Sequence, residues 1–171
     1  MGMNNIRSHI TVLLTLALLL PALRVAAAGE ARISELSYLD RQYMSQQREL
    51  IGDLAALELG RRFNGNADND LEILQLLLDR HLVRSDQTRE LQAMGIIMGD
   101  LLAADLGMDW VVYEDSQGRS RALRYRQSDE YLFPVTMISR RREVGNQTPV
   151  TVIYQKARGI IAPLLPAQPF Q

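Results

Sequence analysis

The sequence predicts a single α+β domain with three N-terminal helices, a small three-stranded antiparallel sheet and two C-terminal helices. Up to Leu106, apolar residues recur at spacings of three and four, which is the period of a helix. After Gly107 the period changes to two, which is typical of strands. The chain has 171 residues, of which 47% are hydrophobic and 23% are charged. This length and composition suit one ordinary domain.

Residues 1–28 predict a cleavable signal peptide. A short polar opening precedes an uncharged apolar run over residues 10–23. That run has the length of a signal-peptide core and is shorter than the roughly 18–20 residues that cross a membrane. The small residues Ala26 to Ala28 suit signal peptidase, so we expect cleavage near Ala28. Arg24 directly follows the apolar run, and this charge favours the alternative, an uncleaved N-terminal membrane anchor. Both predict a bacterial protein outside the cytoplasm, periplasmic or secreted.

Composition excludes several kinds of site. Without cysteine the chain has no disulfide, thiolate metal site, cysteine nucleophile or lipoprotein anchor. Residues 29–118 carry 8 basic and 17 acidic residues, and residues 119–171 carry 9 basic and 3 acidic residues. Two explanations are open: the acidic helices lie near the basic C-terminal part, or a basic face meets an anionic partner.

Residues 30–63 are predicted to form one long amphipathic helix. Such a helix covers the core of its own domain or forms a coiled-coil dimer. A coiled coil needs two apolar positions in each seven-residue repeat. Asp40 and Gln47 occupy the second of these positions, so we expect a monomer. The apolar positions that recur every seven residues are Leu36, Tyr43, Leu50 and Leu57.

Two further helices are predicted before the sheet. The first covers about residues 70–83, with Asn69 or Asp70 as its N-cap. The second runs from a cap at Ser85 or Asp86 to about Leu106, and Gly107 is its expected C-cap. Its two glycines, Gly95 and Gly99, form a notch that lets another segment approach closely.

The strands are predicted over residues 110–114, 121–126 and 131–133. Residues 115–118 form the turn between the first two, because Gly118 can adopt a positive φ. We expect a helix from Pro134 to about residue 143.

Residues 150–162 are ambiguous. Their propensity favours a strand and their periodicity favours a helix. Thr148 as N-cap and Pro149 at the first helical position favour the helix. The domain is therefore expected over residues 29–162, followed by a loose tail over residues 163–171.

Known catalytic motifs are absent. The sequence contains no glycine-rich phosphate loop, no Gly-x-Ser-x-Gly and no His-Glu-x-x-His. After cleavage the one histidine is His81, which we expect partly buried at a helix end. The sequence therefore predicts no catalytic residue, no cofactor and no metal site. The acidic mature chain also disfavours nucleic-acid binding.

Five arginines are the candidate binding residues. Arg140, Arg141 and Arg142 lie together in a predicted helix, and Arg124 and Arg126 share one face of a predicted strand. Guanidinium groups bind phosphates and carboxylates with paired hydrogen bonds, but they also stay solvated at helix ends. The leading hypothesis is a non-catalytic periplasmic binding or interaction module, whose partner is an anionic envelope component or a protein.

The alternative is a carboxylate-dependent hydrolase that acts on an envelope polymer. Such an enzyme needs two carboxylates about 5–10 Å apart in a pocket. The candidates that flank the predicted strands are Asp109, Glu114, Asp115, Asp129 and Glu130.

Residues from about 85 to 162 resemble a bacterial family, domain of unknown function 3806. The resemblance rests on residues 99–102 (Gly-Asp-Leu-Leu), 106–110 (Leu-Gly-Met-Asp-Trp), the Gly118 turn, residues 133–138 (Phe-Pro-Val-Thr-Met-Ile) and Arg140-Arg141. It implies an α+β domain and no established activity.

Overall fold

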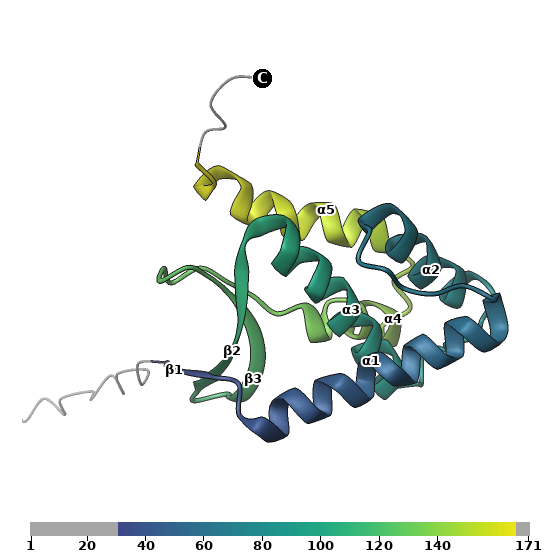
Figure 1. The fold of residues 1–171 in the computed structure, drawn as a ribbon, viewed down its shortest axis with the longest axis horizontal. Coiled ribbons are helices and arrows are strands. Elements are labelled where there is room, and N and C mark those ends of the chain that lie inside the picture. Colours follow the sequence, from purple (N-terminus) through teal and green to yellow (C-terminus); the bar gives the residue numbers. More distant parts are fainter. Residues whose placement is uncertain (1–30, 167–171) are drawn as a thin grey trace, which may run out of the picture.

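The computed structural model describes residues 31–166, so the predicted signal peptide and its cleavage site lie outside the described residues. Within this range the predicted α+β class is confirmed, with helices packed beside one antiparallel sheet (Figure 1). The elements are β1 (Arg32–Glu35), α1 (Tyr38–Leu59), α2 (Ala67–Asp79), α3 (Thr88–Leu106), β2 (Met108–Asp115), β3 (Gly118–Tyr125), β4 (Tyr131–Leu132), the 3-10 turn η1 (Pro134–Thr136), α4 (Ser139–Glu143), α5 (Val150–Ile161) and the 3-10 turn η2 (Ala162–Leu164).

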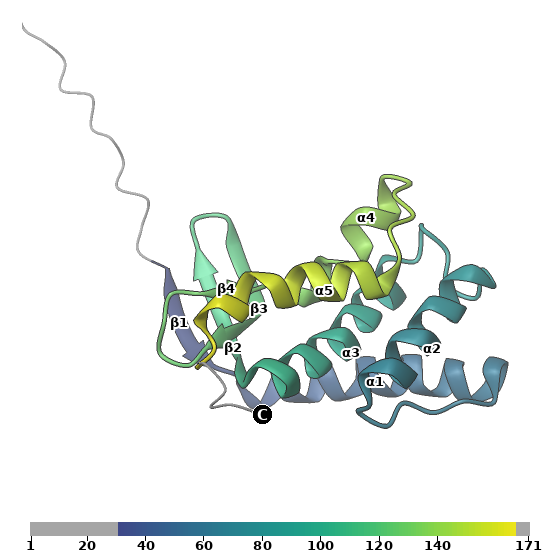
Figure 2. The same cartoon turned by 90° about the horizontal axis from the view of Figure 1, so that it is seen from above.

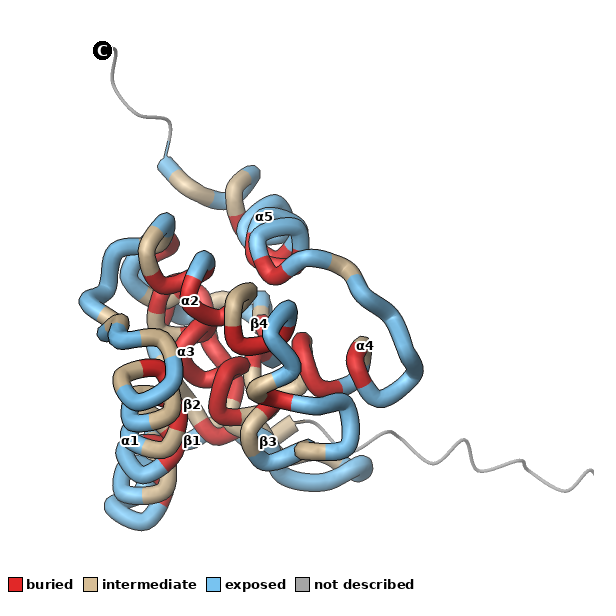
Figure 3. The backbone as a smooth tube through the Cα atoms, turned by 90° about the vertical axis from the view of Figure 1, so that its right-hand side faces the viewer, coloured by how far each residue is buried: buried red, intermediate tan, exposed pale blue. Residues whose placement is uncertain are grey.

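The central helix is α3, which runs between α1 on one side and α5 on the other (Figures 1 and 2). Its apolar residues point inward as its period predicts, and Figure 3 shows the buried residues gathered along it. The fully buried side chains of α3 include Leu91, Met94, Met98 and Leu102. Burial of each such side chain stabilises the fold by roughly 1.5–3 kcal/mol.

The prediction of one helix over residues 30–63 is wrong at its start. Residues 32–35 form β1, which pairs antiparallel with β2 and makes Ile33 face Tyr113. Ser37 then caps α1, because its side-chain oxygen accepts a hydrogen bond from the backbone N–H of Asp40. The sheet consequently has four strands in the order β1-β2-β3-β4, where three were predicted.

The seven-residue pattern in α1 lies only partly toward the core, since Leu50 packs against it and Tyr43 is half-buried. The buried residues of α1 are Asp40, Met44, Gln47, Ile51 and Ala55, whereas Leu57 is 81% exposed. The inward face packs on α3 of the same chain. Thus α1 covers the core of its own domain.

The other helices differ from prediction mainly at their ends. Asn66 caps α2 in place of Asn69 or Asp70, because its side chain accepts from the backbone N–H of Asn69. His81 follows α2 in an exposed turn at φ 55°, so the expected partial burial is wrong.

The C-terminal part contains two α-helices, as predicted. Residues 134–143 are divided into η1 and α4. Residues 150–161 are helical, and Pro149 takes the cap position expected for Thr148. The expected loose tail begins instead with η2. No helix within residues 31–166 is both long enough and apolar enough to span a bilayer.

Candidate functional site

A cleft of about 590 Å³ opens between the β2–β3 hairpin, η1 and α4. The hairpin and α4 lie on the same side of the molecule, at the top of Figure 2. The cleft is lined by residues from α1, α3, both strands of the hairpin, η1 and α4. Its principal side chains are Tyr43, Gln92, Tyr113, Arg119, Arg121, Phe133, Thr136 and Arg140.

Two arginines of β3 line this cleft, and both bind the same buried carboxylate. Arg119 donates from Nη1 to Asp40 Oδ1 over 3.0 Å and from Nη2 to Asp40 Oδ2 over 2.7 Å. Arg121 Nη2 lies 2.9 Å from Asp40 Oδ1. The Asp40 side chain is 3% exposed, whereas those of Arg119 and Arg121 are 44% and 24% exposed. One carboxylate therefore orients two cations that remain accessible to solvent.

The local structure of α1 explains why Asp40 is placed there. Asp40 is the third residue of the helix, and its Oδ2 accepts hydrogen bonds from Ser37 N and Ser37 Oγ. Together with the Ser37 cap these bonds form a capping box. The hydrogen bonds of Arg119, followed by those of Ser37, hold the pKa of Asp40 far below its usual range despite its burial. The carboxylate is therefore ionised at neutral pH.

Arg121 is also held by an aromatic ring. Its guanidinium carbon lies 4.2 Å from the centre of the Tyr43 ring, a cation–π geometry. Its Nε is buried and has no hydrogen-bond partner among the described residues. Arg121 is thus fixed in orientation by Asp40 and Tyr43.

The η1 wall of the cleft lies against the glycine notch of α3. A Cβ atom on Gly95 would lie 2.5 Å from the backbone oxygen of Pro134, and one on Gly99 would overlap the Trp110 ring. The predicted role of the notch is confirmed. Because no larger residue fits there, the two glycines set how closely η1 and β2 approach α3.

Aromatic rings cover the sheet face opposite Arg119 and Arg121. Tyr113 contacts Phe133 edge to face, with ring centres 5.3 Å apart, and contacts Tyr131 at 5.0 Å. The cleft therefore has arginines on one face of β3 and aromatic rings on the other.

The five arginines predicted as binding residues are not brought together. Arg140 is exposed and lines the cleft, and within residues 31–166 it forms no ion pair. Arg141 donates from Nη1 to the backbone oxygen of Met137 over 2.6 Å. Arg142 is 7% exposed and donates to Gln147. Its burial lowers the pKa of this guanidinium.

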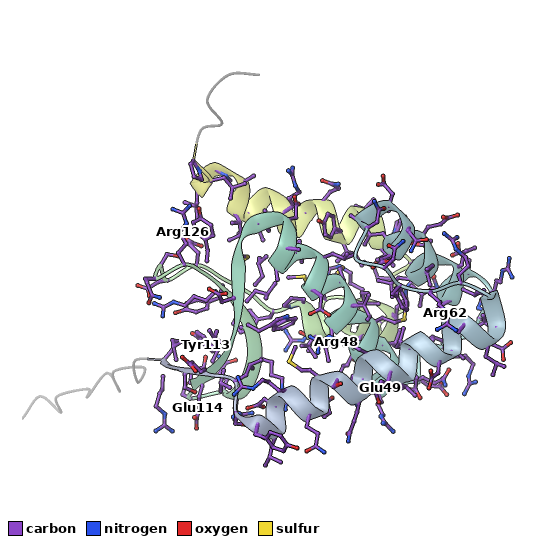
Figure 4. All side chains as sticks on the ribbon, in the orientation of Figure 1. Arg48, Glu49, Arg62, Tyr113, Glu114 and Arg126 are labelled. Atoms are coloured by element: carbon purple, nitrogen blue, oxygen red, sulfur yellow. The ribbon has the colours of Figure 1, made fainter. Side chains whose placement is uncertain are left out.

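Arg124 and Arg126 lie away from the cleft. Arg124 donates from Nε to the backbone oxygen of Ser128 over 2.7 Å and closes the turn after β3. Arg126 is exposed over the Tyr125 ring. Figure 4 shows Arg126 at the end of the sheet nearest the C-terminal helix, far from Glu114 at the other end. Of the five, only Arg140 contributes to the cleft.

The carboxylates of the hydrolase alternative are similarly dispersed. Asp115 alone among the five lines the cleft, where its Oδ1 accepts from Gln117 N over 2.8 Å. Glu114 pairs with Arg32 over 3.0 Å, and Asp129 is 99% exposed. The described residues include no cluster of three histidines or carboxylates that could hold a metal ion.

A second hollow, of about 440 Å³, lies between α1 and α3. Arg48, which Figure 4 shows between α1 and α3, donates from Nε and Nη2 to both oxygens of Asp100 over 2.7 and 2.8 Å. The same carboxylate accepts from Trp110 Nε1 over 3.0 Å. This network is satisfied within the chain and joins α1, α3 and β2.

Fold and site together describe a small α+β domain with an arginine-lined cleft. The family described as a domain of unknown function (DUF3806) matches residues 70–154, so the chain carries a domain of this family. This confirms the resemblance predicted from residues 85–162. No curated protein matches the chain.

One solved structure, a protein of Bacteroides thetaiotaomicron VPI-5482, is similar in fold. The TM-score is 0.68 at 21% sequence identity, over 76% of this chain and 48% of that one. The chain thus spans about half the length of this structural relative. At this identity the similarity establishes the fold alone.

Proposed function

We propose that the protein is an exported, non-catalytic binding module whose ligand is anionic and enters the cleft. The observation that carries this proposal is the placement of Arg119, Arg121 and Arg140 around one opening. Asp115 and the buried Asp40 offset part of this charge, so the site remains net positive. Arginines that are already held in position lose little freedom on binding, which favours paired hydrogen bonds to a carboxylate or phosphate.

Direct binding to the mature chain, residues 29–171, tests the cleft. We expect an anionic polymer such as lipoteichoic acid or lipopolysaccharide, or an acidic protein, to bind more tightly than a neutral polysaccharide. Arg140→Ala should weaken binding several-fold, because a charge at the rim of the site is lost. Arg126→Ala removes a charge that is also exposed but lies outside the cleft, and is the matched control. Equal loss in both variants, or no binding by any anion, would refute the proposal.

Crosslinking in cells gives an independent measure. A photoreactive residue at Thr136, inside the cleft, should form an adduct that Arg140→Ala abolishes. The same residue at Lys156, on the exposed side of α5, is the control. An adduct that forms equally at both positions would count against the cleft.

Export rests on the sequence of residues 1–28. Fractionation followed by mass spectrometry should recover a chain that begins near Gly29. Recovery of a membrane-bound chain that retains Arg7 and Arg24 would instead favour the anchor, and a full-length cytoplasmic chain would contradict export.

A further inference from the structure

The edge of β3 that faces away from β2 is open beside the cleft. β4 is two residues long and pairs with β3 only at Leu123 and Arg124. Continued in the same register, Pro134 would lie opposite Arg121. Proline has no N–H to donate to the ladder, and the chain turns into η1 at this residue. No strand within residues 31–166 therefore pairs with residues 119–121 on this side.

The register fixes where the backbone groups of this edge point. Asp115 pairs with Gly118 across a two-residue turn, so Gly118, Ser120 and Ala122 direct their hydrogen bonds toward β2. The alternate residues, Arg119 and Arg121, direct their N–H and C=O groups the other way. Tyr125, which lies further along β3 in the same alternation, also points away from β2: its N donates to Glu130 O over 3.1 Å. Arg119 and Arg121 thus present unpaired backbone groups on the cleft side.

A strand that paired there would meet different chemistry on its two faces. Side chains on one face would approach Arg119, Arg121 and Arg140. Those on the other face would approach the rings of Tyr113 and Phe133. Successive side chains of a strand alternate between faces, so charge and apolar character should alternate along the ligand.

We propose that the ligand of the cleft is an extended acidic peptide segment of a partner protein, which adds to β3 as an additional strand. Its carboxylates pair with the three arginines, and its apolar side chains contact Tyr113 and Phe133. Its backbone completes the ladder at Arg119 and Arg121. The inference rests on the proposed function and names its ligand class. An anionic polysaccharide offers charge but no alternating N–H and C=O groups.

Selection from a phage-displayed library of random peptides on the mature chain tests this class without assuming a sequence. The expected result is enrichment of peptides with acidic residues at every second position and apolar residues between them. Selection on Arg140→Ala should lose this enrichment, and selection on Arg126→Ala should retain it. Enrichment of peptides without acidic residues, or of none, would overturn the inference.

Backbone methylation of a selected peptide tests strand addition directly. N-methylation at alternate positions should weaken binding about tenfold when it blocks the amides that face β3. Methylation at the intervening positions, whose amides face solvent, should change affinity little. Equal effects of both patterns would overturn strand addition.

Amide hydrogen exchange locates the contact. In the free protein the amides of Ser120 and Ala122 should exchange slowly, and those of Arg119 and Arg121 quickly. Addition of the peptide should slow exchange at Arg119 and Arg121. Unchanged exchange there would overturn the inference. If anionic polymers still bind in an Arg140-dependent manner, the proposed function stands; if they do not, both proposals fail.

Discussion

Asp40 is the residue on which the cleft most depends. It receives hydrogen bonds from the N-terminus of α1 and ion pairs from two residues of β3, so it joins a helix to the sheet. Its pKa is lowered by the Arg119 hydrogen bonds first and the Ser37 bonds next. A lowered pKa in the folded state stabilises the protein above the pKa of the unfolded chain. That stabilisation is lost as the pH falls toward the lowered value.

Asp40→Asn should therefore lower the free energy of unfolding at pH 7 by about 2 kcal/mol. Loss of one partner from a buried pair costs roughly 3–5 kcal/mol, and the cost is smaller here because Arg119 and Arg121 can be solvated. The difference from the unmodified chain should shrink below about pH 4, because Asp40 of the unfolded chain then binds a proton that the folded protein does not, and this favours unfolding. Denaturant unfolding from pH 7 to pH 3 measures this. Asp129→Asn is the control, and an equal cost there would contradict the assignment.

The glycine notch gives a second prediction at residue scale. Gly95→Ala places a Cβ 2.5 Å from a backbone oxygen that cannot move without displacing η1. We expect a loss of about 1–3 kcal/mol from overpacking. Gly159→Ala has open space around its Cβ on α5 and should stabilise the protein by up to about 1 kcal/mol. Thermal unfolding of the two variants should shift in opposite directions, and shifts of the same sign would refute this account.

At the scale of elements, the start of α1 is where sequence reasoning and structure differ most. Apolar residues at spacings of three and four continue N-terminal to α1 as far as Ile33 and Leu36, so they predict a helix from residue 30. Four residues of β1 carry too short an alternation to override that pattern. A local signal was present, since Ser37 and Asp40 have the spacing of a helix start.

Ser37→Ala tests that start. It removes the N-cap and one bond to Asp40, so we expect the free energy of unfolding to fall by about 1 kcal/mol. Ser45→Ala, on the exposed face of the same helix, should change stability by less than about 0.5 kcal/mol. If urea unfolding gave the same loss of stability for both variants, the Ser37 cap would contribute no more than an exposed serine.

Only one of the three cleft arginines was predicted from the sequence. Arg140 was found because it belongs to a run of three arginines. Arg119 and Arg121 were missed, although period two places them on the inward face with Leu123 and Tyr125. Two arginines on an inward face require a buried carboxylate, but nothing in the sequence says that this carboxylate lies 79 residues earlier. Such long-range pairing comes only from the fold.

At the scale of the whole molecule, some of the acidic residues in the N-terminal part form ion pairs with basic residues in the C-terminal part. The acidic helices meet the basic C-terminal part through Asp40 with Arg119 and Arg121, and through Asp105 with Arg158 over 2.7 Å. The explanation by internal complementarity thus accounts for part of the asymmetry. Arg140 and Arg126 remain exposed, so not all of the basic charge is used within the described residues.

The apolar face of α1 is buried within the same chain, so we expect a monomer. Light scattering coupled to size exclusion should give the mass of one chain across a wide concentration range. Leu57→Glu, at an 81% exposed position of the suggested seam, should leave that mass unchanged. A dimer that this variant dissociates would restore the coiled-coil hypothesis.

The pairing of β1 with β2 also constrains the order in which the chain folds. Glu35 pairs with Val111, and Arg32 pairs with Glu114, so three helices intervene between the partners. During synthesis β1 emerges before β2 and has no pairing partner until β2 follows. Contacts that close so long a loop form late, whereas helical contacts are local. We therefore expect the helices to gain protection first in a refolding experiment, and the N-terminal strand to join last.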